Sequence, residues 1–132
     1  MKYVLDSRFL IEYYYSQNPE IKQKSNQKLR ELIRTSNGIV PTIVICETIQ
    51  LIYSREGKQK ADMIYLSIVS SGMKIENLSP SIAKDAGILK STYKHIPIGD
   101  CIIAASAINN QARILSDDPH FDLIKETKRT WL

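Results

Sequence analysis

The chain has 132 residues, of which 43% are hydrophobic and 24% are charged. This length and composition predict one globular domain, residues 1–132, and exclude a disordered chain, which would contain fewer hydrophobic residues. The formal net charge of +4 favours a polyanionic partner only weakly, because soluble proteins that bind no nucleic acid often carry a similar surplus.

The two cysteines, Cys46 and Cys101, lack a C-x-x-C spacing and lie in apolar helical patterns. We interpret them as reduced core residues of an intracellular protein, and they indicate no zinc site. No apolar run approaches the roughly 18 residues of a membrane span, and the charged Asp6 comes too early for a signal peptide. The expected location is therefore the cytoplasm, with no membrane partner.

An apolar, β-favouring run over residues 3–5 stops at Asp6, and hydrophobic residues then recur at helical spacing over residues 7–15. Asp6 is therefore expected at the carboxyl end of a buried strand, where open α/β sheets place their sites. Asn18 can cap a second helix, which begins with a proline and covers residues 19–35.

The next segment predicts a short strand and a helical hairpin. Residues 39–40 form the strand, and Thr42 is the expected N-cap of a helix that carries Glu47 in its first turns. Residues 55–57 break this helix, and the pattern resumes over 59–70.

The remaining elements alternate in the same way. They are a half-solvated strand over 73–78, a helix over 80–93, a buried helix that begins at Asp100, a buried strand over 112–115, a turn over 116–121 and an edge strand within 127–132.

Strands that alternate with helices and helix pairs predict βαβ units. The expected fold class is α/β, with three layers (α/β/α) and a mainly parallel central sheet of four to five strands. Right-handed crossovers place the strand-to-helix turns at one edge of the sheet. Four acidic groups should therefore converge there: Asp6, Glu47, Asp100, and the pair Asp117 and Asp118.

Clustered carboxylates need a cation, because two unit charges about 5 Å apart repel by roughly 3 kcal/mol at an effective dielectric near 20. We predict that Asp6, Glu47, Asp100 and Asp118 are both the metal ligands and the catalytic residues. The sequence leaves open whether Asp117 or Asp118 is the fourth ligand, and the spacing to Phe121 favours Asp118. An all-oxygen site suits Mg²⁺ or Mn²⁺, and the absence of a Cys or His cluster argues against zinc.

A divalent ion held in this way supports hydrolysis of a phosphodiester bond. The chain has no glycine-rich phosphate loop, so cleavage of a nucleic-acid strand is favoured over transfer from a nucleoside triphosphate. Ser7, Ser116 and Asp117 are candidate neighbours that orient carboxylates or waters. His95 and His120 are interpreted as structural or surface residues.

The motifs that contain these residues resemble those of a known protein family. The motifs are Asp6-Ser7 at the N-terminus, Glu47 in PTIVICE, Asp100 in IGDCIIAASA, and the run SDDPHF from Ser116. Together they resemble a PIN domain and, in size and motif order, the VapC toxins of type II toxin-antitoxin pairs. In Arg8 and Cys101 the chain departs from residues that are common in the family.

The resemblance implies a PIN-like, Rossmannoid sheet and a magnesium- or manganese-dependent ribonuclease that acts on RNA. It also implies a homodimer and a small antitoxin partner whose tail occupies the acidic groove. The family's catalytic positions fall on Asp6, Glu47, Asp100 and Asp118.

Other classes of protein fit the motifs less well. A haloacid-dehalogenase-type phosphatase needs a second Asp two residues after the first, where this chain has Arg8. A response-regulator receiver needs adjacent acids near the first strand and a late lysine. The remaining alternative is a PIN-like module that binds RNA or protein with little or no nuclease activity, although such a module has no need for four repelling carboxylates.

Overall fold

The computed structural model describes all of residues 1–132. Its strands are β1 (Tyr3–Leu5), β2 (Gly38–Pro41), β3 (Lys74–Glu76), β4 (Arg113–Leu115) and β5 (Arg129–Thr130). They form one sheet in the order β3-β2-β1-β4-β5, and every neighbouring pair is parallel. The predicted parallel sheet is therefore confirmed, with the short β5 at one edge.

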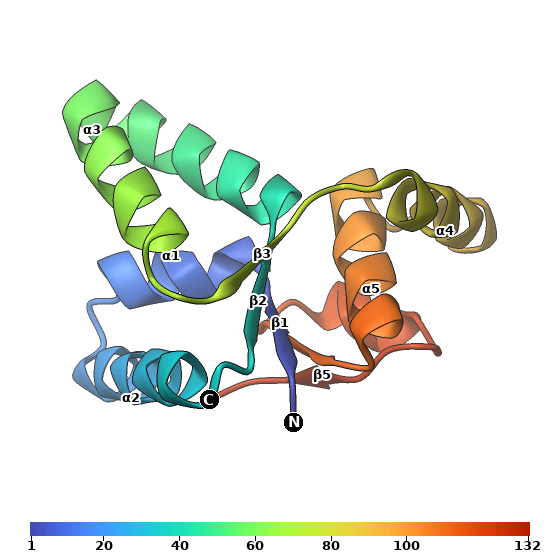
Figure 1. The fold of residues 1–132 in the computed structure, drawn as a ribbon, viewed down its shortest axis with the longest axis horizontal. Coiled ribbons are helices and arrows are strands. Elements are labelled where there is room, and N and C mark those ends of the chain that lie inside the picture. The colour runs from blue at the N-terminus through green and yellow to red at the C-terminus, as the bar shows by residue number, and fades with distance from the viewer.

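Helices cover both faces of this sheet. They are α1 (Ser7–Tyr15), α2 (Pro19–Thr35), α3 (Thr42–Val69), α4 (Pro80–Thr92), α5 (Ile98–Asn110) and the 3₁₀ helix η1 (Pro119–Leu123). Figure 1 shows α1, α2 and α3 on one side of the sheet and α4 and α5 on the other. This is the predicted three-layer α/β arrangement.

Three helices begin at polar caps that the sequence marks. The side chains of Asp6, Asn18 and Ser79 accept hydrogen bonds from backbone N–H groups in the first turns of α1, α2 and α4. Such a cap contributes about 1 kcal/mol and fixes where the helix starts. The predicted bounds of the first two helices, residues 7–15 and 19–35, agree with those of α1 and α2 and are confirmed.

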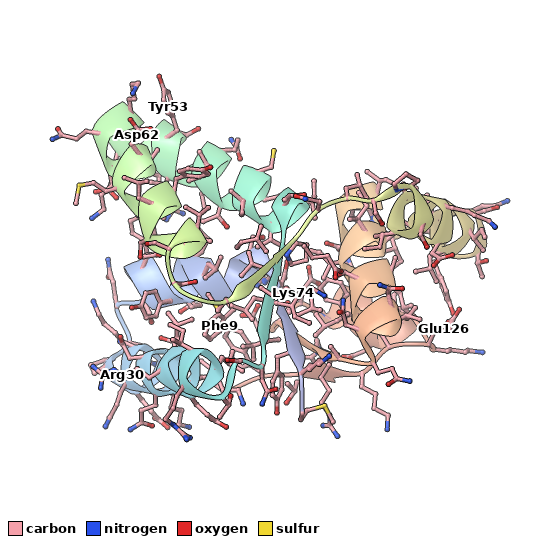
Figure 2. All side chains as sticks on the ribbon, in the orientation of Figure 1. Phe9, Arg30, Tyr53, Asp62, Lys74 and Glu126 are labelled. Carbon is pink, nitrogen blue, oxygen red and sulfur yellow. The ribbon has the colours of Figure 1, made fainter.

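The helix α3 is the predicted hairpin. Its two arms meet at Gly57, whose backbone has φ 82° and ψ −172°, a conformation that is essentially restricted to glycine. Figure 2 shows Tyr53 and Asp62 near the tip of this hairpin, away from the sheet. Although α3 covers 28 residues, neither it nor any other helix is apolar enough to cross a membrane.

Two predicted helix starts are wrong by one or two residues. Thr42 is the first residue of α3 and not its N-cap, and α5 begins at Ile98, which puts Asp100 inside the first turn. In both cases the N-cap residue is a proline, Pro41 or Pro97, with no side-chain cap. The fixed backbone of proline, and not a polar cap, defines these starts.

The core is continuous. All 27 buried hydrophobic residues form a single cluster, which includes Phe9 between the sheet and the helices in Figure 2. Cys101 is buried as predicted, but Cys46 is exposed on α3, so its assignment to the core is wrong. Both cysteines are free thiols.

Candidate active site

The four predicted acidic residues come from four separate elements. Asp6 directly follows β1, Glu47 lies in α3, Asp100 lies in the first turn of α5, and Asp118 follows β4. Since β1 and β4 are neighbours in a parallel sheet, Asp6 and the residues after Leu115 leave it at the same edge. Asp6 is 3% exposed, and the side chains of Asp100 and Asp118 are 14% and 19% exposed.

Ser116 connects two of these acids. Its hydroxyl donates to Oδ2 of Asp6 over 2.7 Å and accepts from the backbone N–H of Asp118 over 3.0 Å. The other oxygen of Asp6 accepts from the N–H of Ser7 over 2.8 Å. Both oxygens of Asp6 thus have fixed positions before any ligand binds, which restricts the orientation of the carboxylate.

Glu47 lies in a close-fitting space beside Gly99. A Cβ atom added to Gly99 would lie 3.1 Å from Oε2 of Glu47. The other oxygen, Oε1, is buried and has no hydrogen-bond partner. A buried carboxylate oxygen without a partner is costly, so this atom needs a proton or a cation.

The acids influence one another's ionisation. The pKa of Asp6 is raised to about 6, mainly by burial and also by the nearby charges of Asp100 and Asp118, against the opposing hydrogen bond from Ser116. Burial, followed by the charges of Asp6 and Asp100, raises the pKa of Glu47 to about 7. Burial and the charge of Asp118 also raise the pKa of Asp100. The structure therefore brings all four acids into one interacting cluster.

Glu76 is a buried acid outside the cluster, and its charge is compensated by neighbouring groups. Glu76 accepts hydrogen bonds from Ser106 over 2.5 Å and from Asn110 over 2.9 Å, and it pairs with Lys74 over 3.1 Å. Burial acts to raise its pKa, but these partners hold the pKa below its usual value. Neither Asp6 nor Glu47 forms an ion pair with a lysine or arginine, so their charges are not compensated in this way.

Asp117 does not share the contacts of Asp118 and instead pairs with Arg8. Its carboxylate accepts a hydrogen bond from Nε of Arg8, and both side chains are partly exposed. Beside this pair lies a groove of about 270 Å³, lined by Ser7, Arg8, Ile11, Glu12, Leu51 and Asp117. The groove is therefore lined by residues of α1 and α3 and by Asp117, and it includes Ser7 and Asp117, the chain neighbours of Asp6 and Asp118.

One residue near the cluster was not predicted as a site residue. Nδ1 of His120 lies 3.4 Å from Oδ2 of Asp100 and 3.5 Å from Oδ1 of Asp118. From the sequence, His120 was interpreted as a structural or surface residue, and its side chain is 48% exposed. The signal available in the sequence was its position two residues after Asp118 in a short turn. His95 is exposed, in the segment between α4 and α5.

The donor set suits a hard divalent ion. Asp100, Asp118 and His120 each offer one atom, and these atoms lie within 4.8 Å of one another. Asp6 and Glu47 add carboxylates that interact with Asp100, and the unpartnered oxygen of Glu47 supplies a further donor. Mg²⁺ and Mn²⁺ take oxygen ligands such as these carboxylates, and His120 adds a nitrogen atom beside them.

The family model described as the PIN domain matches residues 3–126. The chain therefore belongs to the PIN domain family. No protein of curated function matches the chain.

Several solved structures with the same fold are VapBC or toxin-antitoxin proteins. VapBC2 from Rickettsia felis, bound to a DNA fragment of the pair's promoter, is similar with a TM-score of 0.75 and 20% identity over 100% of this chain and 99% of that chain. DNA-bound VapBC from Salmonella typhimurium gives a TM-score of 0.79 and 15% identity over 99% and 98% of the two chains. VapC20 of Mycobacterium tuberculosis is described as a sarcin-ricin loop cleaving toxin. It gives a TM-score of 0.72 and 13% identity, over 94% of this chain and 95% of that chain.

Proposed function

We propose that this chain, acting as a single PIN domain over residues 1–132, is a metal-dependent endoribonuclease that hydrolyses phosphodiester bonds of RNA. PIN domains are generally nucleases. The observation that carries the proposal is the convergence of Asp6, Glu47, Asp100 and Asp118, two of them with pKa values raised to about 6 and about 7. Such a cluster favours bound cations over bare charges.

The proposed roles follow from the contacts. Asp6, Glu47, Asp100 and Asp118 hold Mg²⁺ or Mn²⁺, and Ser116 keeps Asp6 in position through its hydroxyl. When bound, the ion supplies charge neutralisation at a phosphate oxygen and activation of the attacking water. Arg8 places a guanidinium at the edge of the cluster, where it can exchange Asp117 for a phosphate of the RNA.

The substrate assignment has three supports. The net charge of +4 favours a polyanion, and the groove beside Arg8 offers a polyanion a path to the acids. The chain lacks a glycine-rich loop for nucleotide phosphates. One protein of the same fold is described as cleaving the sarcin-ricin loop.

We further propose that the chain is the toxin of a type II toxin-antitoxin pair that acts in the cytoplasm as a homodimer. The support is the fold shared with VapBC proteins, several of which were solved as complexes. A small antitoxin is then the expected partner. Co-expression with the product of a short reading frame directly upstream of the gene, where one is present, should yield a stable complex that cleaves RNA more slowly than the chain alone. A cleavage rate that this product leaves unchanged would contradict this part of the proposal.

The nuclease assignment is tested by substituting one ligand. Asp6→Asn should abolish cleavage of RNA in the presence of Mn²⁺, whereas Asp85→Asn, which changes an exposed acid on α4, should leave the rate unchanged. The measurement is product formation from labelled RNA on a gel, with circular dichroism to show that both variants fold. Equal cleavage by Asp6→Asn and Asp85→Asn would remove the catalytic assignment and favour the binding-module alternative.

A further inference from the structure

The metal site predicted from the sequence contains oxygen ligands only, but the structure places a nitrogen beside it. The side chain of His120 faces two carboxylates from different elements, Asp100 on α5 and Asp118 after β4. Its Nδ1 lies 3.4 Å from one and 3.5 Å from the other. These separations are longer than ordinary hydrogen bonds to nitrogen, which cluster near about 2.9–3.0 Å.

The spacing is close to that of ligands around one ion. Neighbouring ligands of an octahedral ion, each about 2.1 Å from the metal, lie about 3 Å apart. The ligand atoms of Asp100, Asp118 and His120 all lie within 4.8 Å of one another, so a small movement of the exposed imidazole is enough to reach this geometry.

The backbone holds His120 in this position. Its N–H donates to Oδ1 of Asp118 over 2.9 Å, so Asp118 caps η1 and its side chain stays next to that of His120. The next residue, Phe121, is completely buried and anchors the short helix to the core. The position of the imidazole beside the acids is thus built into the turn.

A second observation also points to a cation. Oε1 of Glu47 is buried without a hydrogen-bond partner, and Asp6 and Asp100 are its charged neighbours. The cluster therefore contains a buried oxygen donor that accepts no hydrogen bond, although the Ser7 side chain acts on the same carboxylate and lowers its pKa.

From these contacts we infer that His120 is itself a ligand of the metal, with Asp100 and Asp118, and that the site consequently prefers Mn²⁺ to Mg²⁺. This inference rests on the proposed function, because it concerns the same ion. First-row transition metals accept imidazole nitrogen, and manganese is the weakest binder among them, whereas magnesium takes oxygen ligands. A mixed nitrogen and oxygen site gains affinity for manganese with little gain for magnesium.

The direct test is pulsed electron paramagnetic resonance of the untagged protein loaded with Mn²⁺. A coordinated imidazole nitrogen modulates the electron spin echo, and labelling the protein with nitrogen-15 histidine changes this modulation without any substitution. The chain has only two histidines, so His95→Gln is the matched control. The signal should be present in the wild type and in His95→Gln, and absent in His120→Gln.

Metal affinity gives a second readout. His120→Gln should weaken Mn²⁺ binding by about tenfold or more and change Mg²⁺ binding by less than about twofold. Wild-type protein that binds Mn²⁺ without nitrogen modulation, or a His120→Gln variant that retains the modulation, would overturn the inference. Failure to bind Mn²⁺ at all would overturn it together with the metal requirement of the proposed function.

The two proposals fail in different ways. A nitrogen signal without RNA cleavage leaves the ligand assignment intact and contradicts the nuclease. RNA cleavage without a nitrogen signal leaves the nuclease intact and contradicts the ligand assignment.

Discussion

Asp6 and Glu47 are unusual among the acids of this chain because each has a buried carboxylate oxygen and neither has a cationic partner. An uncompensated buried charge costs several kcal/mol, even after relaxation of the surroundings. Glu76, which Lys74, Ser106 and Asn110 surround, shows how the same fold satisfies an acid that needs no ligand. The contrast supports a cation in the cluster.

Gly99 gives a prediction for a residue that carries no functional group. In Gly99→Ala the new Cβ would lie 3.1 Å from Oε2 of Glu47, so the carboxylate must move by a few tenths of an ångström. We expect RNA cleavage to fall by about tenfold, since small displacements of catalytic groups are costly. Thermal stability should change little, because alanine is the better helix former.

The matched control for this experiment is Gly87→Ala, since a Cβ at Gly87 would meet no atom within 4 Å. The measurement is the cleavage rate of both variants at saturating Mn²⁺. If both variants cleave RNA at the wild-type rate, the close packing of Glu47 is not needed for activity.

At this scale, the convergence of acids could be predicted where an acidic residue lies at the end of an element. Asp6, Glu47, Asp100 and Asp118 were selected in this way, and the structure gathers them. His120 and Gly99 were missed because their importance depends on which side chains face them across the fold. Cys46 was placed in the core because the helical pattern of α3 contains more apolar positions than its buried face can hold.

At the scale of elements, α3 depends on one backbone conformation. Gly57 separates the two arms of the hairpin, and the first of these arms carries Glu47. No atom lies within 4 Å of a Cβ added at Gly57, so only the backbone explains the need for glycine there.

Gly57→Ala should therefore lower the free energy of unfolding by about 1–3 kcal/mol through backbone strain alone. Gly87→Ala, in the middle of α4, should raise it by about 0.5–1 kcal/mol because alanine loses less entropy in a helix. Urea denaturation measures both changes. Equal stability of Gly57→Ala and the wild type would show that the hairpin can turn without a glycine.

Element boundaries were predictable where the sequence contains a polar cap or a glycine break. Asn18 and Ser79 marked α2 and α4 correctly, and residues 55–57 marked the hairpin. Boundaries at Pro41 and Pro97 were missed because a proline in the cap position leaves no side-chain signal. The predicted strand over 73–78 is only Lys74–Glu76, since an edge strand extends only as far as its pairing with β2.

At the scale of the whole molecule, the parallel sheet makes neighbours of residues that are far apart in sequence. Ser116 reaches Asp6 across 110 residues because β1 and β4 pair in register. Alternating strands and helices sufficed to predict this convergence. The sequence did not specify the strand order or the distances between the acids, which depend on how the whole core packs.

The cluster should make the metal-free protein less stable as the pH rises. The pKa of Asp6 rises from 3.8 to about 6 on folding and that of Glu47 from 4.5 to about 7. At pH values between the unfolded and folded pKa of each acid, the folded protein holds more protons than the unfolded chain. The free energy of unfolding therefore falls as the pH rises through this range. Glu76 and Asp122 have lowered pKa values and act in the opposite sense, but their contribution is complete once the pH exceeds their unfolded values of 4.5 and 3.8.

The measurement is the melting temperature in EDTA across the range from pH 5 to pH 7, which lies inside the window set by these pKa values. The melting temperature of the wild type should decrease by several degrees from pH 5 to pH 7, and the decrease should be smaller in Glu47→Gln. A melting temperature that rises over this interval would contradict the proposed interaction of the acids.

The most direct test of the shared cation is the melting temperature of Asp100→Asn against that of the wild type, with and without Mn²⁺. In EDTA the variant should melt above the wild type, because one repelling charge is gone. In saturating Mn²⁺ the order should reverse, because ion binding stabilises the folded wild type by mass action and the variant lacks a ligand. If the wild type gains nothing from Mn²⁺ and the order is the same in both conditions, the four carboxylates do not share an ion.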